Sequence, residues 1–289
     1  MKRITILLCH FIFISFCHSQ TVTKSPDSMK PGNPLEQGYS IVNGLKMYYE
    51  IYGEGKPLVL IHGGGSTIQT TWGRAIPVLA KTHKIIAVEL QAHGRTADRE
   101  KESSFEQDAD DVATLLKNLQ ISKAAVFGFS NGGTTALQLA IRHPALIDQL
   151  IVASALYKRS GAPPEFWEFM KKGTFDDMPQ VYKDAFLTVN PSKEALQRMF
   201  KRDHTRMNKF QDIPDALMSG IKAPTLIIMG DKDVASVEHA AEMQRVISGS
   251  RLMIIPGGHG DYIGEMTRLK DAAEVYIYAL WLIERFFDQ

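Results

Sequence analysis

Cysteine is nearly absent from this chain of 289 residues, which contains two, Cys9 and Cys17. Two cysteines cannot build a disulfide scaffold or a zinc site made of thiolates. Both stand near the N-terminus, in a segment with the pattern of an export signal, so a processed chain would contain no thiol. Any nucleophilic chemistry in the processed chain is therefore expected to depend on serine.

An excess of charge of either sign is also missing, since 33 Lys and Arg face 32 Asp and Glu. A net charge of +1 gives no electrostatic reason to expect nucleic acid as a partner. The histidines form no His-Glu-x-x-His motif, so we expect neither a metal nor another cofactor. The hydrophobic share of 44% is typical of a globular protein, and the length suits one large α/β domain, with or without an insertion.

The first 19 residues have the pattern of a secretory signal peptide. Lys2 and Arg3 precede an almost wholly apolar run over residues 4–16, and a cut after Ser19 would follow small residues. The run is too short to span a bilayer comfortably, so we expect no stable membrane span after cleavage. An uncleaved anchor and a lipoprotein signal are the alternatives. The pattern predicts an exported bacterial protein, either periplasmic or extracellular.

Short apolar runs recur after a linker that we predict over residues 20–37. Asn43-Gly44 stands between two strand-like runs, which is the strongest short signal of a hairpin. Later runs of four or five apolar residues favour strands that are buried on both faces. These six runs cover residues 58–61, 85–88, 124–127, 150–153, 225–229 and 252–255.

Helical periodicity fills most segments between the runs. Apolar residues from Phe105 to Leu119 recur at spacings of three and four, and Ser103 with Glu106 predicts a capping box at the start of this helix. Strands that alternate with helices predict a doubly wound, mostly parallel α/β sheet with a leading antiparallel hairpin. We place this core over residues 38–156 and 223–289.

One long segment, residues 157–222, breaks the alternation because it contains no convincing strand. It is rich in aromatic and Met residues in helix-like patterns, which are broken at Pro164, Pro179, Pro191 and Pro214. Two interpretations stay open: additional helical core, or an inserted helical cap whose apolar underside lines a pocket.

A Gly-x-Ser-x-Gly motif, residues 128–132, follows the run 124–127 and leads into a helical pattern. A nucleophilic serine needs a sharp turn between strand and helix, and the flanking glycines leave room for the adjoining strand and helix. The start of the next helix also points N–H groups toward developing negative charge. We therefore predict Ser130 as a nucleophile, and a glycine-rich turn with a solvated serine is the alternative.

A glycine loop, His62-Gly63-Gly64-Gly65, follows the run 58–61 and lacks the Lys-Ser/Thr pair of a P-loop. Its backbone N–H groups can face an oxyanion. We assign Gly64 as one donor, with Gly65 as its substitute, and the N–H of Asn131 as the other donor. His62 is predicted to anchor the loop rather than to act as a base.

A better base is His259, which follows the last predicted strand, and the acid candidates follow the run 225–229. The chain order serine, acid, histidine is the order expected of a triad on this sheet. All three fall just past the carboxyl ends of strands, where open α/β sheets place their sites. Asp231 directly follows a turn glycine and can serve the turn, so we predict Asp233 as the acid.

With these motifs the sequence resembles the α/β-hydrolase fold superfamily, in its cap-bearing branch. The resemblance runs from about residue 39 to the C-terminus, and it implies an eight-stranded sheet, a cap at 157–222 and a Ser-His-Asp triad. The turn after the second core strand departs from the family's Asp-x-x-Gly-x-Gly-x-Ser, because Glu89, Ala92 and Thr96 replace three of its residues. Similar haloalkane dehalogenases and epoxide hydrolases carry Asp in place of Ser130, so neither activity is expected.

The resemblance implies a serine hydrolase that cleaves a small, apolar carboxylic ester or lactone through an acyl-enzyme. Thioesterase, aminopeptidase, C–C hydrolase and cofactor-free perhydrolase activities stay open, as does a non-catalytic binding protein, because fold does not choose function. Aromatic and Met side chains near the motifs and in the cap are candidates for the substrate pocket: Trp72, Phe129, Phe166, Trp167 and Met170.

Overall fold

The structure is a computed structural model that describes residues 32–268 and 275–288. The predicted signal peptide, residues 1–19, and most of the predicted linker lie outside the described residues. Glu36 and Gln37, which we expected in the linker, are instead the first residues of strand β1. They belong to the strand because they pair with Ile51 and Glu50 of the next strand, and Glu36 also accepts a hydrogen bond from the phenol of Tyr49 at 2.6 Å.

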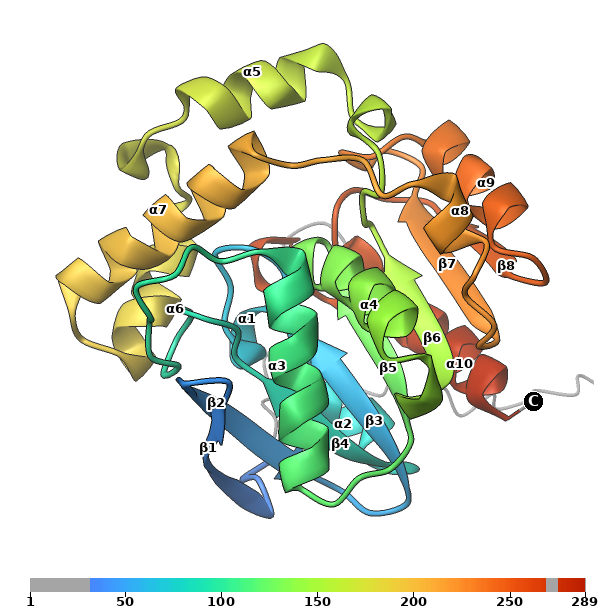
Figure 1. Cartoon of the computed structure of the whole chain (residues 1–289), viewed down its shortest axis with the longest axis horizontal. Coiled ribbons are helices and arrows are strands. Elements are labelled where there is room, and N and C mark those ends of the chain that lie inside the picture. Colours follow the sequence, from blue (N-terminus) through green and yellow to red (C-terminus); the bar gives the residue numbers. More distant parts are fainter. Residues whose placement is uncertain (1–31, 269–274, 289) are drawn as a thin grey trace, which may run out of the picture.

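An eight-stranded sheet forms the centre of the molecule, in the spatial order β1-β2-β4-β3-β5-β6-β7-β8 (Figure 1). Strand β2 is antiparallel to β1 and to β4, and the other neighbours are parallel. This confirms the mostly parallel sheet with a leading antiparallel hairpin. The strands are β1 Glu36–Val42, β2 Leu45–Tyr52, β3 Lys56–Ile61, β4 His83–Val88, β5 Ala124–Phe129, β6 Ile147–Ala153, β7 Thr225–Gly230 and β8 Arg251–Ile255.

Helices cover both faces of the sheet, each face over its own cluster of buried apolar side chains (Figure 1). The α3 helix begins one residue later than its predicted capping box, because Ser104 rather than Ser103 accepts the N–H of Gln107. The helices packed on the sheet are α1 Ile68–Trp72, α2 Ile76–Leu79, α3 Phe105–Asn118, α4 Asn131–Arg142, α9 Val237–Val246 and α10 Val275–Phe287.

Between β6 and β7 the chain forms four helices instead of another strand. In Figure 1, α5 and α7 lie beyond the carboxyl ends of the parallel strands, above the sheet. We use the word cap for residues 157–222, whose α-helices are α5 Pro164–Lys172, α6 Gln180–Val189, α7 Lys193–Asn208 and α8 Asp215–Met218. Short 3-10 helices complete the described residues: η2 Pro144–Leu146, η3 Arg159–Gly161, η4 Phe175–Asp177, η5 Asp261–Ile263 and η6 Met266–Arg268.

The longest helix in the described part of the chain is α7, with 16 residues. Within residues 32–268 and 275–288, no helix combines enough length with enough apolar composition to cross a membrane.

Candidate active site

Ser130 stands on a sharp turn between β5 and α4. Its backbone angles are φ 55° and ψ −123°, a combination that residues other than glycine rarely adopt. Backbone strain of this kind is concentrated at functional sites. The flanking glycines permit the turn because a Cβ at Gly128 would lie 2.1 Å from the carbonyl oxygen of Gly132. A Cβ at Gly132 would lie 2.2 Å from the carbonyl oxygen of Ile61. The geometry is that of the predicted nucleophile turn.

Replacing Gly132 with alanine is expected to destabilise the protein, because the new methyl group would press on the rigid backbone at the end of β3. Overpacking of this kind costs about 3 kcal/mol, which corresponds to a fall in Tm of about 6–12 °C. Thermal unfolding measures the effect. Gly38→Ala is the matched control, since a Cβ there meets its nearest atom at 3.9 Å. Equal Tm values for the two variants would contradict this account of the turn.

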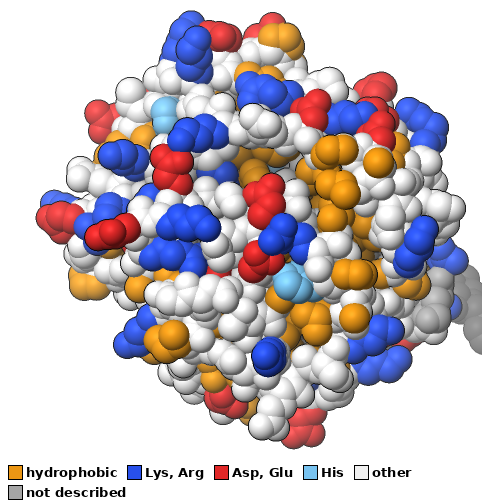
Figure 2. All heavy atoms as spheres, viewed as in Figure 1, with side chains coloured by type: hydrophobic (Ala, Val, Ile, Leu, Met, Phe, Trp, Pro, Cys, Tyr) orange, Lys and Arg blue, Asp and Glu red, His pale blue; other side chains and the backbone are white. Residues whose placement is uncertain are grey.

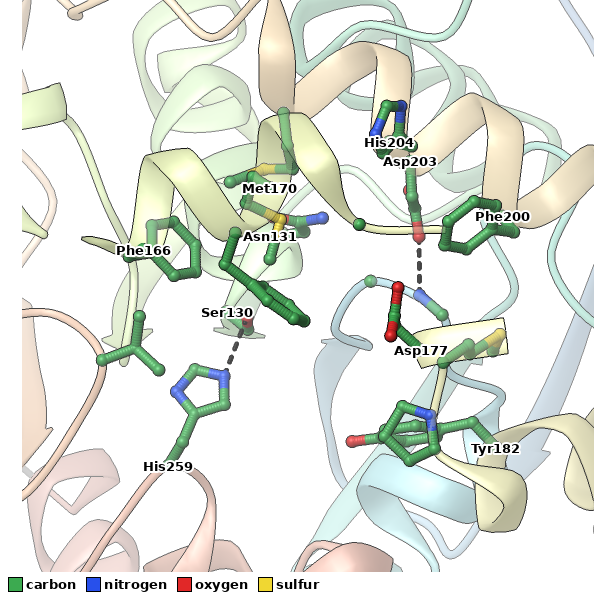
Figure 3. A pocket seen from close by; sticks show the side chains of 18 of the residues that line it. Ser130, Asn131, Phe166, Met170, Asp177, Tyr182, Phe200, Asp203, His204 and His259 are labelled. Carbon is green, nitrogen blue, oxygen red and sulfur yellow. Dashed lines mark hydrogen bonds between the residues drawn. The ribbon is translucent and has the colours of Figure 1, made fainter. Parts of the chain in front are cut away.

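The structure brings the three predicted triad residues together from three separate loops. His259 Nε2 lies 3.0 Å from Ser130 Oγ (Figure 3). His259 Nδ1 lies 2.6 Å from Asp233 Oδ1. A carboxylate only accepts hydrogen bonds, so Nδ1 carries the proton and Nε2 presents its lone pair to the serine hydroxyl. Asp231 lies in the neighbouring turn, where it accepts the N–H of Gly257 at 2.8 Å.

Asp233 is held as a carboxylate by the groups around it. Its side chain is fully buried, and burial alone would raise its pKa. The hydrogen bond and the charge of His259, together with bonds from Ser154 and from the N–H of Val234, outweigh burial, and the pKa of Asp233 lies below its ordinary value. Ser154 in turn contacts the phenol of Tyr262, whose pKa is raised by burial and by Asp233. The acid is therefore ionised and fixed in position.

The candidate oxyanion donors lie beside Ser130 on the same cavity. Within the described part of the chain, the N–H groups of Gly64 and Asn131 donate to no acceptor. The N–H of Gly65 instead donates to Asp203 Oδ2 at 2.6 Å (Figure 3). A Cβ on Gly64 would lie 2.4 Å from the side-chain nitrogen of Asn131, so the side chain of Asn131 packs directly against Gly64. The geometry favours Gly64 over its substitute Gly65.

His62 anchors the glycine loop and does not line the cavity. It is fully buried, its Nδ1 lies 2.7 Å from the carbonyl oxygen of Gly63, and its Nε2 accepts the N–H of Leu90 at 3.0 Å. Burial, with a smaller contribution from His93, lowers the pKa of His62 to about 3. A neutral ring whose two nitrogens both contact backbone groups has no capacity left to act as a base.

A cavity of about 380 Å³ lies over Ser130 and His259, between the sheet and the cap. Phe166 and Met170 line it, as predicted. Figure 3 shows Phe166 on the side of His259, and Asp177, Tyr182 and Phe200 on the far side of Ser130. The remaining apolar lining comes mainly from the cap and from the loop after Asp233: Leu156, Phe169, Met178, Met199, Met207, Phe210, Val234 and Ala235.

Three predicted pocket residues lie elsewhere, so the prediction that they line the cavity is wrong. Trp72 is fully buried under the sheet and packs edge-on against Phe127, with ring centroids 4.7 Å apart. Phe129 is buried beneath His259, with ring centroids 4.7 Å apart. Trp167 faces a separate groove, where it stacks under the guanidinium of Arg159. The packing partners of Trp72 and Phe129 lie far from them in the sequence, whereas Trp167 packs on Arg159 of the nearby η3 turn.

Polar cavity residues of the cap escaped prediction: Asp177, Tyr182, Asp203 and His204. The sequence contained a signal for Asp203, because Arg206 follows it at a spacing of three, which places the two side chains on the same side of a helix. In the structure they form an ion pair. Arg206 also donates to Asp108 of α3 at 2.6 Å, and both side chains are buried. A charged pair buried between cap and core requires such partners.

The network continues from Asp203 to His93, in the loop after β4. His93 Nδ1 lies 2.9 Å from the carbonyl oxygen of Gln91, and Nε2 lies 2.9 Å from Asp203 Oδ2. Both partners only accept, so both ring nitrogens carry protons. Burial alone would lower the pKa of His93, but Asp203 outweighs burial and raises it. Burial likewise opposes ionisation of Asp203, yet His93 and Arg206 hold the pKa of Asp203 well below its ordinary value.

The Asp203–His93 pair is expected to make stability depend on pH. Because the pKa of His93 is raised in the folded protein, its contribution is complete below the unfolded value of about 6.5. That contribution is lost as pH rises through the higher folded value. Asp203, whose pKa is lowered, contributes above about 3.9. The Tm difference between wild type and Asp203→Asn should therefore shrink from pH 6 toward alkaline pH, and a difference that grows instead would contradict the pairing.

Within residues 32–268 and 275–288, no group of three or more His, Cys, Asp and Glu side chains is arranged to hold a metal ion.

Comparison with known families agrees with the sheet and with the turn at Ser130. Residues 56–215 match the model of the alpha/beta hydrolase fold. The chain belongs to this family. The order of the strands and the position of Ser130 at the end of β5 are thus those of an α/β hydrolase.

Several characterised proteins resemble this α/β hydrolase. The serine hydrolase BPHL of Homo sapiens is 27% identical over 83% of this chain and 87% of its own length. The 2-hydroxy-6-oxo-6-(2'-aminophenyl)hexa-2,4-dienoic acid hydrolase of Metapseudomonas resinovorans is 24% identical over 74% of this chain and 80% of its own. The crystal structure of the enol-lactonase from Burkholderia xenovorans LB400 superposes with a TM-score of 0.69 and 22% identity, covering 87% of this chain and 100% of that one.

Proposed function

We propose that this α/β hydrolase is a serine hydrolase that cleaves a carboxylic ester or lactone through an acyl-enzyme. The observation that carries the proposal is the continuous series of contacts from Ser130 through His259 to the buried carboxylate of Asp233, at the floor of a largely apolar cavity. Nucleophile, base and orienting acid at these distances form the arrangement used for acyl transfer.

The residues divide the reaction between them. His259 takes the proton of Ser130 as Oγ attacks the carbonyl carbon, and Asp233 stabilises the imidazolium that forms. The N–H groups of Gly64 and Asn131 bind the oxyanion, each worth about 3 kcal/mol. His259 then gives its proton to the leaving oxygen, which breaks the ester bond. Water, deprotonated by His259, attacks the acyl-enzyme, and the acid product leaves with Ser130 restored.

The charge of the cavity bears on the class of substrate. Neither Lys nor Arg is among the described residues that line it, whereas Asp177 and Asp203 are. Over the outer face, Lys and Arg alternate with Asp and Glu without an extended patch of one sign (Figure 2). C–C bond cleavage is the second candidate function, because one relative is named for a dienoic acid. His93 and Arg206 balance the charge of Asp203, which leaves Asp177 as the carboxylate that faces the cavity. An anionic dienoate would approach Asp177 without a Lys or Arg among the described lining residues, so a neutral ester or lactone fits better.

A matched pair of esters tests this preference. We expect kcat/KM for p-nitrophenyl butyrate to exceed that for p-nitrophenyl hemisuccinate by about tenfold or more, since repulsion of like charges costs roughly 1–2 kcal/mol. Added salt and Asp177→Asn should both narrow the gap. Equal rates for the two esters would contradict the charge argument. Cleavage of a dienoate in preference to both esters would replace ester hydrolysis with the second candidate.

We also propose that the chain is exported with removal of residues 1–19. The support is the sequence pattern of two basic residues followed by an apolar run. N-terminal sequencing of the protein recovered from the periplasm or medium is expected to begin at Gln20. Recovery of the intact N-terminus from a membrane fraction would instead indicate an anchor.

A further inference from the structure

The loop that carries the proposed oxyanion donor has little stiffness of its own. It contains three consecutive glycines, residues 63–65, and Gly65 adopts a positive φ of 68°. Glycine populates many backbone conformations, so such a run does not hold an N–H group in one direction by itself. An oxyanion donor acts only if it is already oriented when charge develops. The Gly64 N–H therefore requires a restraint from outside the loop.

That restraint comes from the cap. Asp203, on α7, accepts the N–H of Gly65 at 2.6 Å, and the same oxygen lies 3.1 Å from the place of a Cβ on Gly64. The Gly65 N–H also lies 3.3 Å from His93 Nε2, but the shorter contact and the proton on that nitrogen assign the bond to the carboxylate. The bond fixes the peptide plane between Gly64 and Gly65, one peptide away from the proposed donor.

Asp203 is itself held by two groups besides Gly65. Its Oδ2 accepts from His93, and its Oδ1 accepts from Arg206, which is fixed by Asp108 of the core. A lone carboxylate next to an oxyanion would oppose the reaction. Here one imidazolium and one guanidinium balance the two carboxylates, so the acceptor is provided without a net negative charge on this network.

We propose that Asp203 is a positioning residue that holds the oxyanion loop in its working conformation from the cap. It makes and breaks no bond in the reaction, and its effect on rate passes through Gly65 to Gly64. The proposal rests on the serine hydrolase function proposed above. It makes assembly of the oxyanion site depend on the cap being seated on the core.

A second contact between α7 and the core provides a control. It distinguishes orientation of the glycine loop by Asp203 from attachment of the cap to the core. Arg202 of α7 binds Asp98 of the core through contacts of 3.1–3.2 Å and does not line the cavity. Losing this contact removes one ion pair between cap and core, while the bonds between Asp203 and Gly65 and between Arg206 and Asp108 stay in place and keep the cap seated. Arg202→Met is therefore the matched control for variants of Asp203.

The test compares steady-state kinetics on p-nitrophenyl butyrate. Asp203→Ala is expected to lower kcat by about 10–100-fold with KM within about twofold, because only the transition state needs the oriented donor. Asp203→Asn keeps an oxygen acceptor for Gly65 and should retain kcat within about threefold, as should Arg202→Met. If Asp203→Ala does not fold, Asp203→Glu, which displaces the carboxylate by one methylene, should show the same loss of kcat.

Three results would overturn the proposal: Asp203→Ala matching Arg202→Met in kcat, a loss confined to KM, or Asp203→Asn as impaired as Asp203→Ala. If Asp203→Glu is used because Asp203→Ala does not fold, a kcat of Asp203→Glu equal to that of wild type would likewise overturn the proposal. Amide hydrogen exchange of the loop measures the restraint without depending on turnover, since the Gly65 N–H should exchange faster in Asp203→Ala than in Arg202→Met. A wild type without ester hydrolysis but with this exchange difference would refute the function and leave the restraint standing.

Discussion

Ser130→Ala is expected to lower kcat for p-nitrophenyl butyrate by about 10⁴- to 10⁶-fold. The variant removes the hydroxyl that lies 3.0 Å from His259 Nε2, so no acyl-enzyme can form on residue 130. Binding should persist, because the apolar lining and the N–H groups of Gly64 and Asn131 stay in place. The residual rate would come from the oxyanion site and from substrate binding alone.

The comparison variant for Ser130→Ala is Ser219→Ala, an exposed serine at the end of α8 that is remote from the cavity lining. It should behave as wild type. Circular dichroism and thermal unfolding show whether Ser130→Ala is folded. A folded Ser130→Ala protein that keeps more than about one hundredth of wild-type kcat would remove Ser130 from the role of nucleophile.

Asp233→Asn is expected to lower kcat by about 10³- to 10⁴-fold while the fold is retained. An amide in place of the carboxylate can donate to Nδ1 of His259, which favours the tautomer with its proton on Nε2. That nitrogen could then no longer accept the proton of Ser130. The amide also lacks the charge that stabilises the imidazolium.

Asp231→Asn is the control for this change, because it alters the neighbouring acid of the same turn. An amide oxygen can still accept the N–H of Gly257, so kcat should stay within about threefold of wild type. The reverse pattern, with Asp231→Asn inactive and Asp233→Asn active, would show that Asp231 is the acid that orients His259.

Much of the core could be predicted because its signals are local. Runs such as 58–61 and 225–229 are too apolar for any place except a sheet buried on both faces, and Asn43-Gly44 marks its hairpin. Ser130, Asp233 and His259 each follow such a run. The carboxyl ends of parallel strands meet along one edge of a sheet, so the three side chains converge although 129 positions separate Ser130 from His259.

The pocket could not be predicted in the same way, because it depends on which face each cap helix turns toward the core. Periodicity identifies the apolar side of α5, yet Phe166 and Met170 face the cavity while Trp167 stacks with Arg159. Asp203 resembles any surface acid of a polar helix until α7 is packed over the glycine loop. Ser154 was not predicted because its bond to Asp233 joins residues that are 79 positions apart, and no sequence motif links them.

The central claim, that Ser130 is an activated nucleophile, is tested most directly by labelling the intact protein with a fluorophosphonate probe and locating the adduct by mass spectrometry. We predict one adduct, on the peptide that contains Ser130, formed by wild type and absent from folded Ser130→Ala. Asp233→Asn should label far more slowly than Asp231→Asn. A folded wild-type protein that acquires no adduct, or one whose adduct lies on another residue, would contradict the claim.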